Sequence, residues 1–418
     1  MKILFVDHPQ YISGSMRLWQ GLNEVLPGSV VLYPHVATHY GVESFELTQQ
    51  PWFQTMAGQA ARGELPSGIP PFAPGEGLTG GNQTLMMHEG LVFKPPMPEN
   101  PPDEDEIVRQ LDAGVFDLVI LANSNRVPTF ALARLKQRVK SMPPIVYYDA
   151  GERDELNEHW IHVFRPAIVF KQILTPEVLS RGMTVKIPGY TLKMLPFPLS
   201  NLFVDHPDFV LGHGSQERPT VGKLRAADGP EHKEFDLFYY LGETWPTRRL
   251  ATAALDELRI RRGFRWTPGV CFEAYNVVLS KTRLAISMRG SGRDTTRYWE
   301  IPGYRTALVA DGTMGCIHPY PFEHDKTAIF YDSLESLTSM IDLYLSDTTG
   351  RLDRIALAGK DHLWRYHSTA ARGVFFLDRV QEILGVRLSQ AQEDSISAWK
   401  TARAWSSKWE GPVVSANV

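Results

Sequence analysis

The residues best suited to binding an anion lie in one segment, 288–300, with the sequence MRGSGRDTTRYWE. The segment follows an apolar run and opens a helical pattern, so free backbone N–H groups and the helix dipole would favour a negative charge there. The guanidinium groups of Arg293 and Arg297 have the geometry that matches phosphate oxygens. We therefore expect a diphosphate to bind here, with Arg289 in the same site.

The remaining polar residues of this segment suit the same ligand. Gly290 and Gly292 would allow the backbone to come close to it. Thr295 or Thr296 could cap the helix or bind an oxygen. Glu300, about one turn into the helix, could accept two hydrogen bonds from a ribose diol. The alternative is a solvated loop with an ordinary helix start, because the segment contains no Walker or dinucleotide fingerprint.

A second basic segment follows an earlier apolar run. Arg248 or Arg249 could share the charge of a diphosphate, or the segment could be an ordinary helix start with Thr247 as its N-cap.

Three residues of the N-terminal half are candidates for a general base that activates an acceptor hydroxyl: Asp7, His8 and Asp149. Gly14, in a Ser-Gly-Ser loop after the first apolar run, is expected to face the donor. Asn123 and Asn125 could bind sugar hydroxyls or form a turn. A lone Asp or His at a strand end also has the structural alternative of holding a turn.

The elements that would position these residues alternate along the chain. In the N-terminal half we expect strands at 2–7, 29–33, 117–122, 145–148, 167–170 and 192–195, with helices near 16–26, 104–113 and 128–140. In the C-terminal half we expect strands at 235–241, 283–288 and 306–310 and helices near 247–261, 274–281, 333–346, 350–366 and 369–384. This alternation predicts α/β architecture with two Rossmann-like domains facing each other across a cleft.

The expected domain boundaries follow from the polar and proline-rich stretches. The first domain spans 1–204 with an irregular, proline-rich insertion at 50–103, and 205–233 is a linker. The second domain spans 234–385. A C-terminal tail, 386–418, carries tryptophans with helical spacing. It could lie on a membrane surface, but we expect it to pack back on the first domain.

Composition narrows the class of protein. The 418 residues carry a net charge of −4, which does not favour nucleic acid as a partner. The two cysteines are far apart, and no apolar run is long enough to cross a membrane. We therefore expect a cytoplasmic protein without stable membrane insertion. His318, Glu323, His324 and Asp325 match no zinc or iron spacing, so no metal site is expected.

Residues 235–372 resemble the C-terminal domain of bacterial group 1 glycosyltransferases, and most closely the spore-maturation-protein-like subgroup. The resemblance is carried by Arg297-Tyr298-Trp299-Glu300, the apolar run with its aspartate at 307–311, and the segment 330–334. The turn at 149–154, followed by 169–171, is similar to an N-domain feature of this group. The resemblance implies a GT-B fold and metal-independent transfer of a sugar from a nucleotide-diphosphate donor, with no further cofactor.

The sequence departs from the wider class at one position. Retaining members often carry two glutamates eight positions apart, but Gly292 and Leu308 stand eight positions before and after Glu300. This leaves open whether the enzyme retains or inverts configuration. It also leaves two alternative functions, a catalytically inactive GT-B-like binding or assembly protein and a nucleotide-sugar epimerase.

Overall fold

The computed structural model describes most of the chain, and its contacts divide the chain into two compact units. Unit 1 comprises residues 1–198 and 372–418, and unit 2 comprises residues 199–371. The described residues are 1–7, 13–40, 44–71, 84–86, 95–122, 126–151, 153–182, 187–200, 233–242, 245–266, 272–290, 292–312, 315–406 and 414–417. The expected linker at 205–233 therefore lies almost entirely outside them. No helix in the described ranges has the length and apolar character needed to cross a bilayer.

Unit 1 is built on a seven-stranded sheet in the order β13-β8-β7-β6-β5-β1-β2. The strands are β1 (Ile3–Val6), β2 (Val30–Tyr33), β5 (Leu118–Leu121), β6 (Ile145–Asp149), β7 (Ile168–Lys171), β8 (Thr191–Pro196) and β13 (Val414–Asn417). All neighbours pair in parallel except β13, which pairs antiparallel with β8. The central strands are apolar without alternation because both faces of the sheet are covered.

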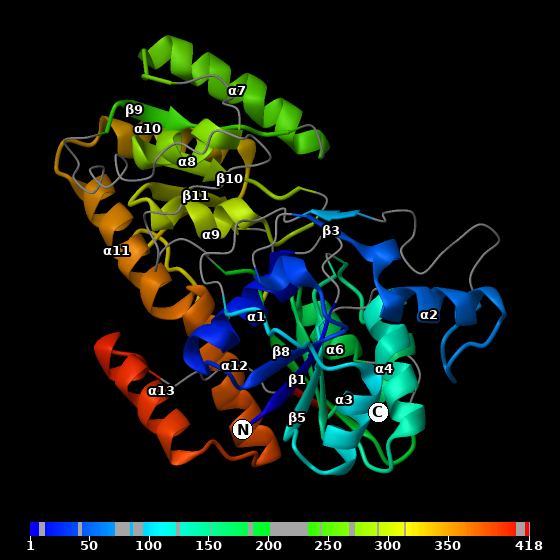
Figure 1. Cartoon of the computed structure of the whole chain (residues 1–418). Coiled ribbons are helices and arrows are strands. Elements are labelled where there is room, and N and C mark those ends of the chain that lie inside the picture. The colour runs from blue at the N-terminus through cyan, green and yellow to red at the C-terminus, as the bar shows by residue number, and fades with distance from the viewer. Residues whose placement is uncertain are drawn as a thin grey trace. The chain divides into compact units, whose positions relative to one another are not determined.

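Unit 1 also contains helices, of which α4 contacts strands β1 and β5 (Figure 1). They are α1 (Ser13–Val25), α2 (Pro51–Ala61), α3 (Glu104–Asp112), α4 (Arg126–Arg138), α5 (Glu158–Phe164), α6 (Pro176–Arg181), α12 (Thr369–Leu384) and α13 (Gln390–Ala402). Two 3-10 turns, Ala37–Tyr40 and Leu47–Gln49, and a small antiparallel pair, β3 (Ser44–Glu46) with β4 (Thr84–Met86), complete the unit.

The C-terminal segments are integral to unit 1. In α12, the Phe376 ring lies 4.7 Å from that of Phe170 on β7. In α13, Gln392 donates a hydrogen bond to the Met1 carbonyl at 2.9 Å. These contacts place α12 in unit 1. Its residues were expected in the second domain, which was predicted to end at 385.

Two expectations for unit 1 are wrong in detail. Residues 51–61 of the expected irregular insertion form the helix α2, because Pro51 occupies the first helical turn, where proline is tolerated, and Phe53 and Met56 provide a buried face. The C-terminal tail is not helical throughout, because α13 ends at Ala402 and strand β13 follows.

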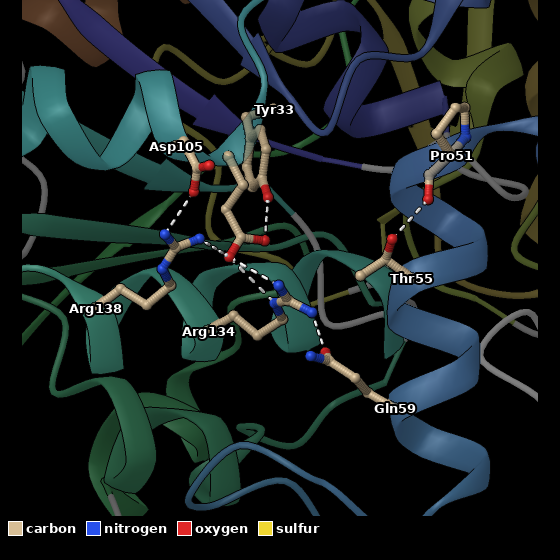
Figure 2. Close-up of polar contacts among 8 residues, drawn as sticks. Tyr33, Pro51, Thr55, Gln59, Asp105, Arg134 and Arg138 are labelled. Carbon is tan, nitrogen blue, oxygen red and sulfur yellow. Dashed lines mark hydrogen bonds and ion pairs between the residues drawn. The ribbon is translucent and has the colours of Figure 1, made fainter.

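A polar cluster joins four elements of unit 1 around Glu104, the first residue of α3 (Figure 2). Its carboxylate accepts hydrogen bonds from Tyr33 Oη at 3.0 Å, Arg134 Nη2 at 2.8 Å and Arg138 Nη1 at 2.6 Å. Arg134 also donates to Gln59 of α2. Burial would raise the pKa of Glu104, but the hydrogen bonds from Arg134 and Arg138 hold it below its ordinary value.

Unit 2 is a four-stranded parallel sheet in the order β12-β11-β10-β9. Its strands are β9 (Phe235–Phe238), β10 (Thr282–Ser287), β11 (Ala307–Asp311) and β12 (Ile329–Tyr331), and its helices are α7 (Pro246–Arg262), α8 (Phe272–Ser280), α9 (Thr296–Gly303), α10 (Leu334–Ser346) and α11 (Arg351–Tyr366). One buried cluster packs α7 and α10 on one face of the sheet, and a second packs α8 and α9 on the other. The α/β class expected from the sequence is confirmed in both units.

Gly373 of α12 gives a test of the packing in unit 1. A Cβ atom at this position would lie 2.7 Å from the carbonyl oxygen of Gly21 in α1, a backbone atom that cannot move aside alone. We predict that Gly373→Ala lowers the free energy of unfolding by about 1–3 kcal/mol through overpacking. Gly58→Ala in α2 is the control, since its Cβ would meet only a flexible Arg62 guanidinium at 3.4 Å. Urea denaturation of both variants checks this, and equal midpoints would contradict the close helix contact.

Glu104 gives a pH test of the same unit. A carboxylate with a lowered pKa in the folded state contributes stability above its unfolded pKa, and this contribution is lost as the pH falls through the folded pKa. We predict that Glu104→Gln lowers the free energy of unfolding at pH 7 by about 1–2 kcal/mol, allowing for solvent screening. The difference from the unaltered protein should shrink below the ordinary pKa of 4.5. Glu99→Gln, at an exposed position, is the control in parallel urea titrations.

Candidate functional site

The carboxyl ends of β9 and β10 bring together the two basic segments singled out in the sequence. These strands are neighbours in the unit 2 sheet, so the chain that follows β9 into α7 lies beside the chain that follows β10 into α9. In a parallel sheet this edge is where ligands bind. The two segments, which were expected to share the charge of one ligand, therefore follow neighbouring strands at this edge.

Arg248, in the first turn of α7, joins the two segments. Its side chain is buried and donates hydrogen bonds to the carbonyl oxygens of Met288 at 2.7 Å, Arg289 at 2.9 Å and Gly242 at 3.3 Å. Burial lowers the pKa of Arg248, and the nearby charge of Arg297 lowers it further. A buried cation therefore lies under the loop between β10 and α9. Arg249 is exposed on α7, so the structure separates the two arginines that the sequence could not distinguish.

Two further arginines are held by aromatic rings. The Arg289 guanidinium lies 4.5 Å from the ring centroid of Trp245. The Arg297 guanidinium lies 5.6 Å from the ring of Tyr240 and 6.0 Å from that of Tyr275. Neither arginine forms an ion pair with a carboxylate in the part of the chain that the structure describes. A cation–π contact holds a guanidinium beside a ring without using its N–H groups as hydrogen-bond donors to a carboxylate.

The helix start beside these arginines has no side-chain cap. Thr295 occupies the N-cap position of α9, but its hydroxyl lies 2.8 Å from Ser287 Oγ instead of capping the helix. Of the alternatives expected for Thr295, a side-chain cap is not formed, because the hydroxyl bonds to the neighbouring strand. Thr296 is the first helical residue. The first-turn N–H groups thus face the site without a capping side chain.

The loop that leads into α9 is held by a buried carboxylate. Asp294 accepts hydrogen bonds from Trp299 Nε1 and from the backbone N–H of Leu199, each at 2.7 Å. Within the loop, the Gly290 N–H donates to the Gly292 carbonyl at 3.1 Å, and both glycines are buried. Arg293 lies half-buried in the same loop. These hydrogen bonds, within the loop and to the buried Asp294 carboxylate, fix the conformation of the loop.

Glu300 lies on the buried side of α9 beside two tyrosines. Its Oε2 accepts a hydrogen bond from Tyr275 Oη at 3.2 Å. Burial raises the pKa of Tyr275 and Tyr304 well above the ordinary value, and the Glu300 charge raises both further. Both phenols therefore remain protonated donors at neutral pH. The sequence pointed to Glu300 but not to its neighbours. Tyr240 and Trp245 follow a strand and Tyr275 lies within α8, and an aromatic residue in either place has no distinctive spacing.

In unit 1 the candidate bases carry cationic or imidazole partners. Asp7 is fully buried after β1, and its Oδ2 lies 3.1 Å from Nε2 of the equally buried His39. Asp149, at the end of β6, forms a buried ion pair with Lys171 at 3.2 Å. His8 lies outside the described residues, as do Asn123 and Asn125.

Gly14, near the start of α1, is fitted closely against the ends of β6 and β7. A Cβ atom there would lie 2.7 Å from Tyr148 Oη and 3.2 Å from Gln172 Oε1. Glycine at this position therefore serves close packing of the α1 start on the sheet.

The acidic and histidine residues at 318–325 have protein partners. Asp325 accepts from Arg351 Nε at 2.8 Å and from Tyr344 Oη at 2.8 Å. Glu323 pairs with Lys326 at 2.5 Å, and His324 Nδ1 accepts from the Phe330 N–H at 3.0 Å. Among the described residues, no group of three or more His, Cys, Asp or Glu side chains could hold a metal ion.

Comparison with known proteins bears on the site in unit 2. Residues 224–378 match the family model described as glycosyl transferase-like. The matched residues include Arg248, Arg289, Arg297 and Glu300. The sequence-based resemblance over 235–372 is thus confirmed for this part of the chain. No curated protein matches the sequence.

Solved structures show the fold of the whole chain. A glycosyltransferase from Rickettsia africae aligns over 92% of this chain and 98% of its own, with 11% identity and a TM-score of 0.51. Anabaena HepE, crystallised with UDP, aligns over 91% of this chain and 100% of its own, with 12% identity and a TM-score of 0.47. The first likeness shows that the chain has the GT-B fold, with two Rossmann-like units.

Asp294 gives a test of how the site is held. We predict that Asp294→Ala lowers the free energy of unfolding by about 2–4 kcal/mol, because it leaves two buried N–H donors without an acceptor. Asp294→Asn should be milder, since the amide oxygen can still accept. Glu257→Ala, at an exposed position in the middle of α7, is the control and should change stability by less than about 0.5 kcal/mol. Thermal unfolding separates the three variants, and a neutral Asp294→Ala would contradict this role.

Proposed function

We propose that this protein is a glycosyltransferase that takes a sugar from a nucleotide-diphosphate donor bound by unit 2. The observation that carries the proposal is the group of arginines at the carboxyl ends of β9 and β10. Arg289 and Arg297 are supported by aromatic rings in place of carboxylates, and Arg248 is buried beneath them with a lowered pKa. Like charges gathered in this way repel each other, so an anionic ligand would relieve the repulsion.

The ligand that fits this arrangement is a nucleoside diphosphate. The uncapped first turn of α9 and the two stacked guanidinium groups match phosphate oxygens. Glu300, with Tyr275 donating to one of its oxygens, can accept hydrogen bonds from a ribose diol. As the bond to the sugar breaks, negative charge grows on the diphosphate, and fixed cations stabilise it most at that stage. The match of 224–378 to a glycosyl transferase-like family supports this assignment.

In this proposal the acceptor is bound by unit 1, and a carboxylate at the ends of its strands removes the proton of the attacking hydroxyl. Asp7 is the stronger of the two described candidates, because Asp149 is neutralised by a buried lysine. His39 would fix the orientation of the Asp7 carboxylate. The base, the acceptor and independence from metal all belong to the proposal.

One observation favours a second candidate, a GT-B protein that binds a nucleotide sugar without catalysis. Both described carboxylates already have buried partners, His39 and Lys171, so neither is an open base. Release of UDP from UDP-glucose by the purified protein would exclude this candidate. Stable binding of the intact donor over hours, without release, would support it.

The experiment that tests the donor site is a thermal-shift series with UDP, GDP, ADP, TDP and CMP, each with and without EDTA. A ligand present at about 100 times its dissociation constant should add about 2.7 kcal/mol of stability. We expect one diphosphate to raise the melting temperature equally in both conditions. A shift abolished by EDTA would contradict metal independence, and no shift with any nucleotide would contradict the donor site.

Variants of Glu300 test its role in binding ribose. We predict that Glu300→Ala weakens binding of the preferred nucleoside diphosphate by about 1–3 kcal/mol, because hydrogen bonds to the diol are lost. Binding of inorganic pyrophosphate, which has no ribose, should be unchanged. Isothermal titration calorimetry with both ligands checks this, with Arg249→Ala as a surface control. An equal loss for both ligands would show that Glu300 acts on the phosphate site instead.

A further inference from the structure

A groove runs along the outer edge of the unit 1 sheet. Strand β2 is the last strand of that sheet and pairs only with β1 in the described chain. Beside it lies a cavity of about 430 Å³, lined on one side by β2 and on the other by residues between Pro95 and Gln110. This volume is in the range of sites that hold small ligands. The groove is separate from the arginine site, which belongs to unit 2.

The backbone of β2 offers hydrogen-bonding groups to this groove. The carbonyl oxygens of Ser29 and Tyr33 accept hydrogen bonds from the N–H groups of Ile3 and Asp7 on the β1 side. Bonding groups of a strand alternate in direction, so those of Val30 and Leu32 face away from β1. The opposite wall carries Pro95, Pro96 and Pro98, which have no N–H to donate. The wall therefore cannot complete a ladder with β2.

The side chains of the groove suit an uncharged ligand. Among the described lining residues, Lys2 and Glu106 have opposite charge, and Gln110 donates a hydrogen bond to Glu106. The exposed amide of Asn100 supplies a neutral donor and acceptor. At the carboxyl end of β2, the rings of His35 and Tyr40 stack with centroids 5.3 Å apart. Proline and aromatic faces with amides between them fit a ligand with apolar C–H faces and many hydroxyl groups.

His35 adds a neutral polar group to this end of the groove. Burial lowers the pKa of His35, and the nearby His39 lowers it further, so the imidazole is uncharged at neutral pH. Its Nδ1 atom has no hydrogen-bond partner in the described ranges. His35 therefore contributes a neutral imidazole, not a cation, to the lining at this end of the groove.

The groove is firmly built and leads toward the carboxyl edge of the sheet. The hydrogen bond from Tyr33 to Glu104 joins β2 to the start of α3, directly after the proline wall, and Arg134 and Arg138 fix that carboxylate (Figure 2). His39, between the two groove residues His35 and Tyr40 in the chain, bonds to Asp7. The carboxyl end of the groove is thus linked to the candidate base Asp7 through the buried His39.

We propose that this groove binds a neutral oligosaccharide, the acceptor chain to which the sugar is added. This inference rests on the proposed glycosyltransferase function and names the class of its acceptor. A peptide added as a further strand fits less well, because β2 has four residues and only Val30 and Leu32 direct their backbone groups outward. The outward N–H and C=O groups of Val30 and Leu32, beside the proline and aromatic faces of the groove, match the hydroxyl groups and C–H faces of sugar units better than they match a peptide strand.

The test is saturation-transfer difference NMR of the full chain with four neutral tetrasaccharides: maltotetraose, cellotetraose, mannotetraose and chitotetraose. We expect transfer to at least one of them. Tyr40→Ala should weaken its binding about fivefold or more through loss of an aromatic contact. Asn100→Ala, an exposed position that cannot affect the core, should also weaken it, while Trp364→Ala on α11 of unit 2 should not.

Three results would overturn the proposal: no transfer to any tetrasaccharide, transfer that is unchanged in both groove variants, or stronger binding of tetragalacturonate than of every neutral chain. The donor is tested separately by UDP binding to the same samples. A protein that binds a tetrasaccharide through the groove but no nucleotide would refute the proposed donor site and keep the groove. A protein that binds a nucleotide but no tetrasaccharide would refute the groove proposal and keep the proposed donor site.

Discussion

Mutual repulsion among arginines at one sheet edge is the constraint on which the candidate site depends. Guanidinium groups are normally balanced by carboxylates, but here Arg289 and Arg297 stack on aromatic rings and Arg248 bonds to backbone carbonyls. These contacts fix the positions of the three cations. The positive charge that they bring together makes this edge suitable for a diphosphate.

The supports of this edge reach far into unit 2. Asp294 links the glycine loop to Trp299 in α9 and to Leu199 at the start of the unit. Arg248 links the start of α7 to the end of β10. Each support is a buried polar group with specific partners, so the loop has one favoured conformation. The geometry of the site is therefore prepared before a ligand arrives, which lowers the cost of binding.

The sequence predicted most of the parallel strands because they are short apolar runs buried on both faces, a pattern that few other structures produce. Arg297 and Glu300 were singled out because a basic, glycine-containing turn precedes their helix, and their role in binding stays a prediction. The prediction was wrong at α2. The many prolines nearby indicated an irregular segment, but Pro51 occupies the first turn of a helix, where proline is tolerated. The prediction also missed β13, which is defined by pairing with a strand more than 200 residues away. Tyr275, Trp245 and Asp294 were missed because their roles depend on tertiary neighbours.

The most direct measurement is the dissociation constant of UDP for the unaltered protein and for the double variant Arg289→Gln, Arg297→Gln. Both side chains contact aromatic rings, and neither pairs with a carboxylate among the described residues, so their replacement leaves no unpaired carboxylate there. The account predicts a loss in affinity of about 100-fold or more, as expected when two charge-assisted hydrogen-bonding groups are removed from a phosphate site. An affinity unchanged in the double variant, with the fold intact, would contradict the claim that this edge binds the donor diphosphate.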